Sequence, residues 1–148
     1  MNRQFSAEFK EYNYLHSEIG SLYHEAALAV GLSDSVMNIL YTVTTYGSEC
    51  TQSNISWLTG ISRQTINSAI RRLEQDGILY LEEINRKNKT IRLTEKGQAL
   101  VDEKVMPMMA AELAVFENWS QEDREALLRL TQKYLNDFRY NLGKGEQK

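Results

Sequence analysis

Cysteine and proline are almost absent from this chain: each occurs once among 148 residues, as Cys50 and Pro107. A single cysteine cannot form an intramolecular disulfide, which excludes the disulfide-rich scaffolds of small secreted proteins. No apolar run approaches the roughly 18 residues of a membrane-spanning helix, and the N-terminus lacks the charged-then-apolar pattern of a signal peptide. We therefore expect a cytoplasmic protein without a membrane partner.

Residues typical of catalytic and metal sites are also scarce. The only histidines are His16 and His24, which excludes a His-rich metal site and argues against a structural zinc site. The sequence contains no Gly-rich phosphate loop, nucleophile elbow or paired-carboxylate signature. We expect no enzymatic activity, no cofactor and no metal, and we interpret Cys50 as a small, partly buried residue rather than a redox switch.

The composition is otherwise ordinary for one soluble globular domain. Apolar residues make up 42% of the chain and charged residues 25%, which argues against disorder, and the length suffices for a real core. The formal net charge is −3. Taken alone, this acidic balance argues against a nucleic-acid partner.

A long amphipathic helix is predicted over residues 5–30. Its apolar and aromatic positions recur at alternating steps of four and three, which is a heptad stripe. They are Phe5, Phe9, Tyr12, His16, Ile19, Tyr23, Ala26 and Val30. The short segment that follows cannot bury so long a stripe, so the helix needs a second surface, either another chain or its own C-terminal helix.

Three further helices are expected after it. The first covers about residues 34–46. Either Thr51 or Ser53 caps a short second helix that Gly60 closes, and Ser62 caps the third after a turn of two or three residues. Two short helices joined by a tight Gly-containing turn are typical of the helix-turn-helix.

A hairpin is predicted directly after the third helix. Residues 78–81 and 90–93 have the pattern of two strands, and the polar, basic segment 85–89 forms the tip between them. A hairpin in this position is a wing. Beyond it, Thr94 opens a helix in which we expect a kink at Pro107, and Ser120 caps the last helix.

The third helix presents two different faces. Its inward stripe consists of Ile66, Ala69, Ile70 and Leu73. The opposite face has no acid between Arg63 and Arg72 and carries the side-chain types that bind base edges, Arg to guanine, Gln and Asn to adenine, Ser and Thr to either. The alternative is an ordinary solvated face. We predict DNA contacts at Ser62, Arg63, Gln64, Thr65, Asn67, Ser68, Arg71 and Arg72, and at Arg86, Lys87 and Lys89 in the wing.

Charge is distributed unevenly along the chain. Residues 60–92 carry seven bases and four acids, whereas residues 1–59 carry two bases and six acids and residues 93–148 carry eight and ten. The helix-turn-helix and wing are therefore basic inside an acidic chain. Because phosphate binding depends on the local footprint, the negative total does not exclude DNA.

At four places the sequence resembles the winged helix-turn-helix of MarR-type transcriptional regulators. These are Ser-Asn-Ile-Ser at 53–56, Gly-Ile-Ser-Arg-Gln-Thr-Ile at 60–66, Arg-Leu-Glu-Gln-Asp-Gly-Ile-Leu at 72–79, and Leu-Thr-Glu-Lys-Gly at 93–97, which is similar to the family's junction after the wing. No single segment is specific, but their order extends over almost the whole chain.

The resemblance implies a mainly α fold with a small β-hairpin wing, in which long N- and C-terminal helices dimerise. The segments of this one integrated domain would be 1–32 (N-terminal dimerisation helix), 33–97 (winged helix-turn-helix), 98–142 (C-terminal dimerisation helices) and 143–148 (flexible tail). A homodimer would bind a pseudo-palindromic operator, usually as a repressor. The dimer interface would include Phe5, Phe9, Tyr12, His16, Ile19, Tyr23, Leu135 and Phe138.

The resemblance also implies that a small molecule or an oxidant modulates DNA binding. Candidates for lining an effector pocket are Tyr12, Tyr23, Trp57, Met106 and Met109, with ordinary core packing as the alternative for each. The oxidation-sensing branch of the family has a Cys in its first long helix, and this chain has none there.

The wing departs from the family pattern. The family commonly has Asp-x-Arg, whose Arg enters the minor groove, and the matching positions here are Asn85 and Lys87, with Arg86 between them. Lysine lacks the planar fork of arginine, so we expect weaker minor-groove readout, with either Lys87 or Arg86 as the inserted residue. The alternative function is a winged-helix module that binds a protein and not DNA.

Overall fold

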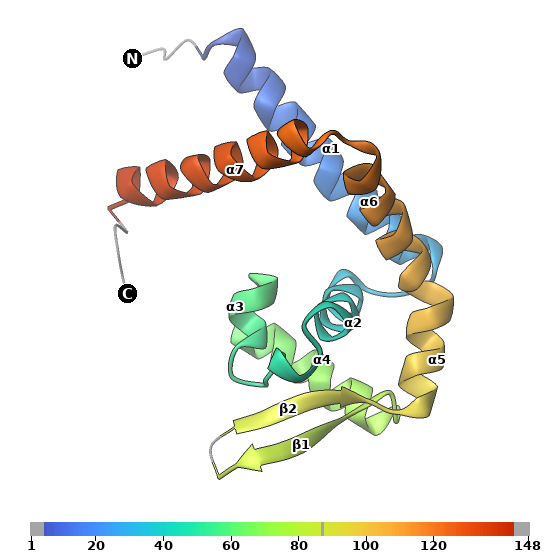
Figure 1. The fold of residues 1–148 in the computed structure, drawn as a ribbon. Coiled ribbons are helices and arrows are strands. Elements are labelled where there is room, and N and C mark those ends of the chain that lie inside the picture. The colour runs from blue at the N-terminus through green and yellow to red at the C-terminus, as the bar shows by residue number, and fades with distance from the viewer. Residues whose placement is uncertain (1–4, 87, 144–148) are drawn as a thin grey trace. The chain divides into compact units, whose positions relative to one another are not determined.

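The computed structural model describes residues 5–86 and 88–143. Its elements are α1 (Ala7–Ala29), α2 (Asp34–Tyr46), the short 3₁₀ helix η1 (Gly47–Glu49), α3 (Ile55–Thr59), α4 (Arg63–Gln75), β1 (Leu79–Asn85), β2 (Asn88–Leu93), α5 (Glu95–Lys104), α6 (Met106–Asn118) and α7 (Gln121–Asn141) (Figure 1). The fold is mainly helical with one antiparallel hairpin, which confirms the predicted class. The chain divides into two compact units, Met1–Met108 and Met109–Lys148.

Side-chain caps begin most of the helices. The hydroxyls of Ser33, Ser62, Thr94 and Ser120 each accept a hydrogen bond from the backbone N–H three residues later. Such a cap satisfies one of the amides that a helix start leaves without an intrahelical partner. The predicted starts of α2, α4, α5 and α7 are therefore confirmed.

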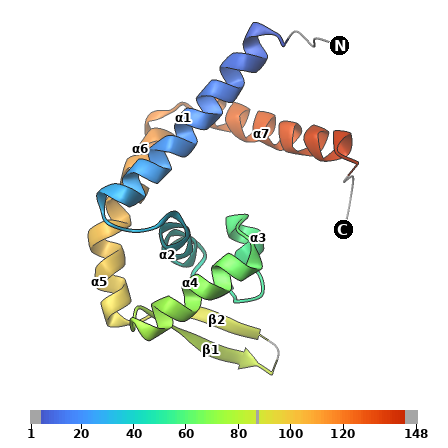
Figure 2. The same cartoon turned by 180° about the vertical axis from the view of Figure 1, so that it is seen from behind.

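The core of the first unit lies between α2, α3, α4, α5 and the hairpin. Its largest fully buried side chains include Ile39, Leu40, Ile55, Ile66, Ile70, Leu79, Ile91 and Val101. Of the predicted inward stripe of α4, Ile66, Ile70 and Leu73 are buried and Ala69 is half-buried. Seen from behind, α4 crosses the hairpin, which packs against it through β1 (Figure 2).

The wing is longer than predicted and its tip is shorter. The strands pair from Leu79 opposite Leu93 to Asn85 opposite Asn88. Asn85 closes the turn, because its side-chain oxygen accepts a hydrogen bond from the backbone N–H of Asn88 at 3.0 Å. The predicted tip, residues 85–89, is too long. Polar residues interrupt the alternating pattern from which a strand is predicted, but the backbone pairing of the two strands continues through them. Lys87 lies outside the described residues.

The chain before α3 adds a short third strand-like segment to the wing. The N–H of Gln52 donates to the carbonyl of Lys89 at 2.9 Å, and the N–H of Ile91 donates to the carbonyl of Cys50 at 3.0 Å. Between them, Thr51 forms a bridge with Thr90. The segment that leads into the helix-turn-helix is thereby fixed to the edge of β2 that does not pair with β1.

The predicted cap of α3 is wrong. The helix begins after Asn54, and neither Thr51 nor Ser53 occupies the capping position. Instead, Thr51 and Asn54 bond each other: the Asn54 side chain accepts from the N–H of Thr51 at 2.8 Å, and the Thr51 hydroxyl accepts from the N–H of Asn54 at 3.3 Å. The two side chains hold a turn that precedes the helix.

Pro107 divides the predicted kinked helix into two. α5 ends at Lys104 and α6 begins at Met106, with Val105 between them. Proline lacks an N–H and its ring clashes with the carbonyl four residues earlier, but it fits the first turn of a new helix. The expected kink is therefore a complete break.

The second unit is a pair of helices formed by most of α6 and all of α7. Arg124 joins them, because its Nη1 donates to the carbonyls of Phe116 at 2.9 Å and Trp119 at 2.8 Å. Neither helix contains a buried residue. The apolar side chains of this unit are therefore exposed or half-buried.

Candidate nucleic-acid interface

The turn between α3 and α4 sets the direction of α4. Gly60 ends α3 in the left-handed region at φ 69°, a conformation that glycine adopts without steric cost. The hydroxyl of Ser56 donates to the carbonyl of Ile61 at 2.6 Å. Ser62 then caps α4, so three consecutive local interactions define the helix-turn-helix.

The polar face of α4 is exposed along its length. The cap and the seven helix residues predicted to contact DNA are all exposed: Ser62, Arg63, Gln64, Thr65, Asn67, Ser68, Arg71 and Arg72. Its side chains are anchored by the buried Ile66, Ile70 and Leu73 on the opposite side. A helix held in this way presents a rigid row of hydrogen-bonding groups to a partner.

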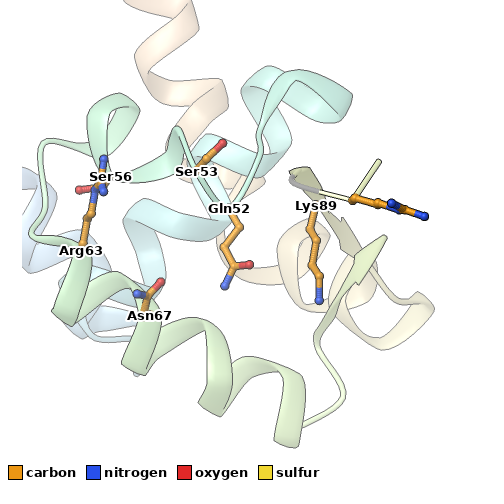
Figure 3. A pocket seen from close by; sticks show the side chains of 7 residues that line it. Gln52, Ser53, Ser56, Arg63, Asn67 and Lys89 are labelled. Atoms are coloured by element: carbon orange, nitrogen blue, oxygen red, sulfur yellow. The ribbon is translucent and has the colours of Figure 1, made fainter. Parts of the chain in front are cut away.

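A groove of about 330 Å³ lies between the α3–α4 pair and the wing. It is lined by Gln52, Ser53, Ser56, Arg63, Asn67, Arg86 and Lys89. Figure 3 shows Gln52 and Lys89 extending from neighbouring segments, with Arg63 and Asn67 on α4. The structure thus brings together four of the predicted contact residues, Arg63, Asn67, Arg86 and Lys89.

The groove is positively charged. Three of its seven lining residues are cationic and none is acidic. Within the described part of the chain, neither Arg63, Arg86 nor Lys89 has an ion-pair partner. Their charges are therefore available to an anionic partner.

Two other cations of this region are engaged. Nε of Arg92 lies 2.8 Å from the carboxylate of Glu82 across the wing, and Nε of Arg72 lies 3.9 Å from the carboxylate of Asp76. Both pairs are exposed, so each contributes at most about 1 kcal/mol. Arg92 is not one of the predicted DNA contacts, and its side chain is paired with Glu82 within the wing.

Three lining residues were missed by the sequence analysis: Gln52, Ser53 and Ser56. They lie before and within α3, which is the first helix of the helix-turn-helix and not its recognition helix. Gln52 reaches the wing because residues 50–52 pair with β2. No sequence pattern in so short a segment indicates that pairing.

Residues 11–109 match the sequence model of the ArnR1-like, winged-helix domain. The match covers more than half of the chain and the whole of the helix-turn-helix and hairpin. The chain belongs to this winged-helix family. Comparison with curated protein sequences gives no significant match.

Solved structures show that the fold of this winged-helix protein is that of MarR-family regulators. AbsC, a MarR family transcriptional regulator from Streptomyces coelicolor, is 20% identical with a TM-score of 0.69 and covers 93% of this chain and 99% of its own. The S. aureus MepR–DNA complex is 18% identical with a TM-score of 0.65, over 91% and 99%. NadR in complex with 4-hydroxyphenylacetate is 14% identical with a TM-score of 0.69, over 90% and 96%.

The residues predicted for a dimer interface lie at the surface. Every one of them is exposed in the single chain: Phe5, Phe9, Tyr12, His16, Ile19, Tyr23, Leu135 and Phe138. On α1 the rings are ordered by neighbours, with Phe5 stacked on Phe9 and Tyr12 on His16 at centroid distances of 5.3 and 6.0 Å. Four of the eight predicted side chains are thus stacked in pairs.

The residues suggested for an effector pocket do not line the groove. Trp57 is 79% exposed on α3, and Tyr12, Tyr23 and Met106 are also exposed, whereas Met109 is half-buried.

The remaining reactive residues have ordinary surroundings. Cys50 is fully buried, and burial raises the pKa of its thiol from 9.0 to about 11. Nδ1 of His24 lies 2.9 Å from the carboxylate of Asp34 at the junction of α1 and α2. Among residues 5–86 and 88–143, no group of three or more His, Cys, Asp or Glu could hold a metal ion.

No single helix in the described chain is long and apolar enough to cross a membrane. α1 and α2, bent by 95°, reach that length and composition only as a pair.

Proposed function

We propose that this winged-helix protein is a sequence-specific DNA-binding transcriptional regulator. The observation that carries the proposal is the groove, which is lined by cations from α4 and from the wing and by no carboxylate. Positively charged side chains on a helix that also presents Gln, Asn and Ser are suited to phosphates and base edges together. The similarity in fold to MepR, solved with DNA, supports the same activity.

The finer parts of the proposal are a cytoplasmic homodimer, repression and control by a small molecule. The exposed apolar stripes of α1 and α7 support dimerisation, and two recognition helices would then enter successive major grooves about 34–36 Å apart. The similarity to NadR, solved with 4-hydroxyphenylacetate, supports an effector. In this proposal residues 1–32 and 98–142 form the dimer body, and an effector that binds it releases the operator.

Selection of bound sequences from random duplex DNA tests the proposal. We expect enrichment of one inverted repeat with half-sites centred about 10 base pairs apart, because a two-fold dimer binds a two-fold site. Enrichment of single half-sites would contradict the dimer. Absence of any salt-sensitive DNA binding would refute DNA recognition and favour the protein-binding module.

A further inference from the structure

The groove divides the polar residues of α4 into two rows. Arg63 and Asn67 line the groove, four residues apart, whereas Gln64, Ser68 and Arg71 are exposed and do not line it. At about 100° per residue, the second row lies roughly a quarter-turn around the helix from the first. The two rows therefore face different surroundings.

Arg63 and Asn67, which we call the groove row, are surrounded by donors from other elements. Gln52, Arg86 and Lys89 line the same groove as Arg63 and Asn67, and Gln52, Lys89 and Asn67 can be followed in Figure 3. The backbone hydrogen bond from Gln52 to Lys89, at 2.9 Å, fixes the two walls relative to each other. The three cations only donate, whereas the two amides and the hydroxyls of Ser53 and Ser56 both donate and accept.

This set of groups matches a phosphodiester. Phosphate oxygens are acceptors that bind guanidinium, ammonium and amide groups, and an anion compensates converging cations. An arginine can also bind the two acceptors of a guanine edge, but a base edge carries no charge to compensate three cations that line one groove, whereas a phosphate does. In a duplex the phosphate backbone is a ridge, which fits a concave protein surface. The base edges lie at the floor of the major groove, where side chains that project from a helix can reach them.

We infer that the groove holds one phosphodiester strand of the operator and that Gln64, Ser68 and Arg71 read its bases. The inference rests on the proposed function and deepens it. Arg63, which the sequence analysis assigned to bases, becomes a backbone contact together with Gln52, a residue outside the predicted recognition helix. Phosphate contacts set the register of the protein on DNA, and base contacts set its sequence preference.

The matched pair Arg63→Gln and Arg71→Gln tests this division. Both variants remove one exposed arginine from the same helix, one from each row. We expect Arg63→Gln to select the wild-type operator from random DNA, to weaken operator and random duplex by the same factor, and to lower the salt slope of the dimer by about two, one for each copy. Arg71→Gln should relax preference at one position of each half-site, by roughly 5- to 150-fold.

Single uncharged methylphosphonates in the operator identify the phosphate concerned. At the phosphate in the groove, the loss of affinity from the methylphosphonate and from Arg63→Gln or Gln52→Ala should be less than additive, because both remove the same contact. Additive losses at every position would overturn the inference.

The outcomes separate the two proposals. A wild-type protein that binds neither selected nor random DNA refutes the proposed function, and the division with it. If the wild type binds its operator but Arg63→Gln changes the selected base, or Arg71→Gln leaves the selection unchanged, only the division is overturned.

Discussion

Gly97 lies where the first turn of α5 meets the backbone of Ile78. A Cβ atom on Gly97 would lie 1.9 Å from the carbonyl oxygen of Ile78 and 2.9 Å from its carbonyl carbon. Thr94 holds this contact: its N–H donates to the carbonyl of Ile78 at 3.0 Å, and its hydroxyl donates to that of Gly77 at 2.6 Å. The end of the wing and the start of α5 are joined here, with no room for a side chain.

Gly97→Ala should therefore destabilise the fold. Alanine is favoured over glycine in a helix by about 1 kcal/mol, but here the methyl group must separate two backbone segments, at a cost of about 1–3 kcal/mol or more. Urea unfolding measures the net loss. The control is Gly20→Ala in α1, where an added Cβ meets no atom within 4 Å, and which should gain roughly 0.5–1 kcal/mol. A Gly97→Ala variant as stable as the wild type would show that the junction is not rigid.

Cys50 should be unreactive in the folded protein. Burial raises the pKa of its thiol to about 11, so at pH 8 only about one molecule in a thousand carries the reactive thiolate. We expect slow labelling by a thiol reagent until urea unfolds the chain, and DNA binding that hydrogen peroxide does not alter. Because the unfolded chain loses this proton first, the free energy of unfolding should also fall as the pH rises from 9 towards 11. Rapid labelling of the native protein would reopen the redox role.

At the scale of elements, local signals in the sequence were sufficient for the helices and insufficient for their contacts. Capping residues and apolar spacing identified α2, α4, α5 and α7, because caps and periodicity act within a few residues. The strand lengths and the pairing of Gln52 with Lys89 depend on segments far apart in the chain. The same limit applies to the site: the polar face of α4 was predictable, but the groove row was not, since it requires the position of the wing.

Asn54 holds the segment that carries two of the missed groove residues, Gln52 and Ser53. Its side chain accepts from the N–H of Thr51 at 2.8 Å and donates to the carbonyl of Glu49 at 2.9 Å. We expect Asn54→Ala to lower the free energy of unfolding by about 1–3 kcal/mol, because the partly buried N–H of Thr51 and the exposed carbonyl of Glu49 lose their partner.

We expect Asn54→Ala to lower DNA affinity as well. Fluorescence anisotropy well below the melting temperature measures this affinity. The matched control is Asn38→Ala, whose side chain bonds the carbonyl of Asp34 on an exposed face of α2. It should change stability by less than about 0.5 kcal/mol and leave DNA affinity intact. Equal effects of the two substitutions would show that the turn before α3 does not position the groove.

At the scale of the whole molecule, α1 and α7 share one property: each helix carries large apolar side chains that are exposed. Ile19 is 54% exposed on α1 and Phe138 is 50% exposed on α7. Contiguous apolar surface of this kind marks an interaction site in soluble proteins, and the heptad spacing of the α1 stripe is the pattern by which helices pack together. Each stripe is therefore a surface that the proposed dimer could use.

Ile19→Glu should dissociate that dimer. A carboxylate in the middle of the stripe would be buried without a partner on association, which costs several kcal/mol per copy. Sedimentation should show the wild type at twice the 17.1 kDa of the chain and the variant at the mass of one chain. Ser21→Glu is the matched control, because it adds the same charge to the face of α1 that already carries Glu18 and Glu25, and it should remain a dimer. Since a two-fold operator is bound by both copies, Ile19→Glu should also lose operator affinity while its folded lobe retains salt-sensitive binding to random DNA. An Ile19→Glu variant that still sediments as a dimer would place the interface elsewhere.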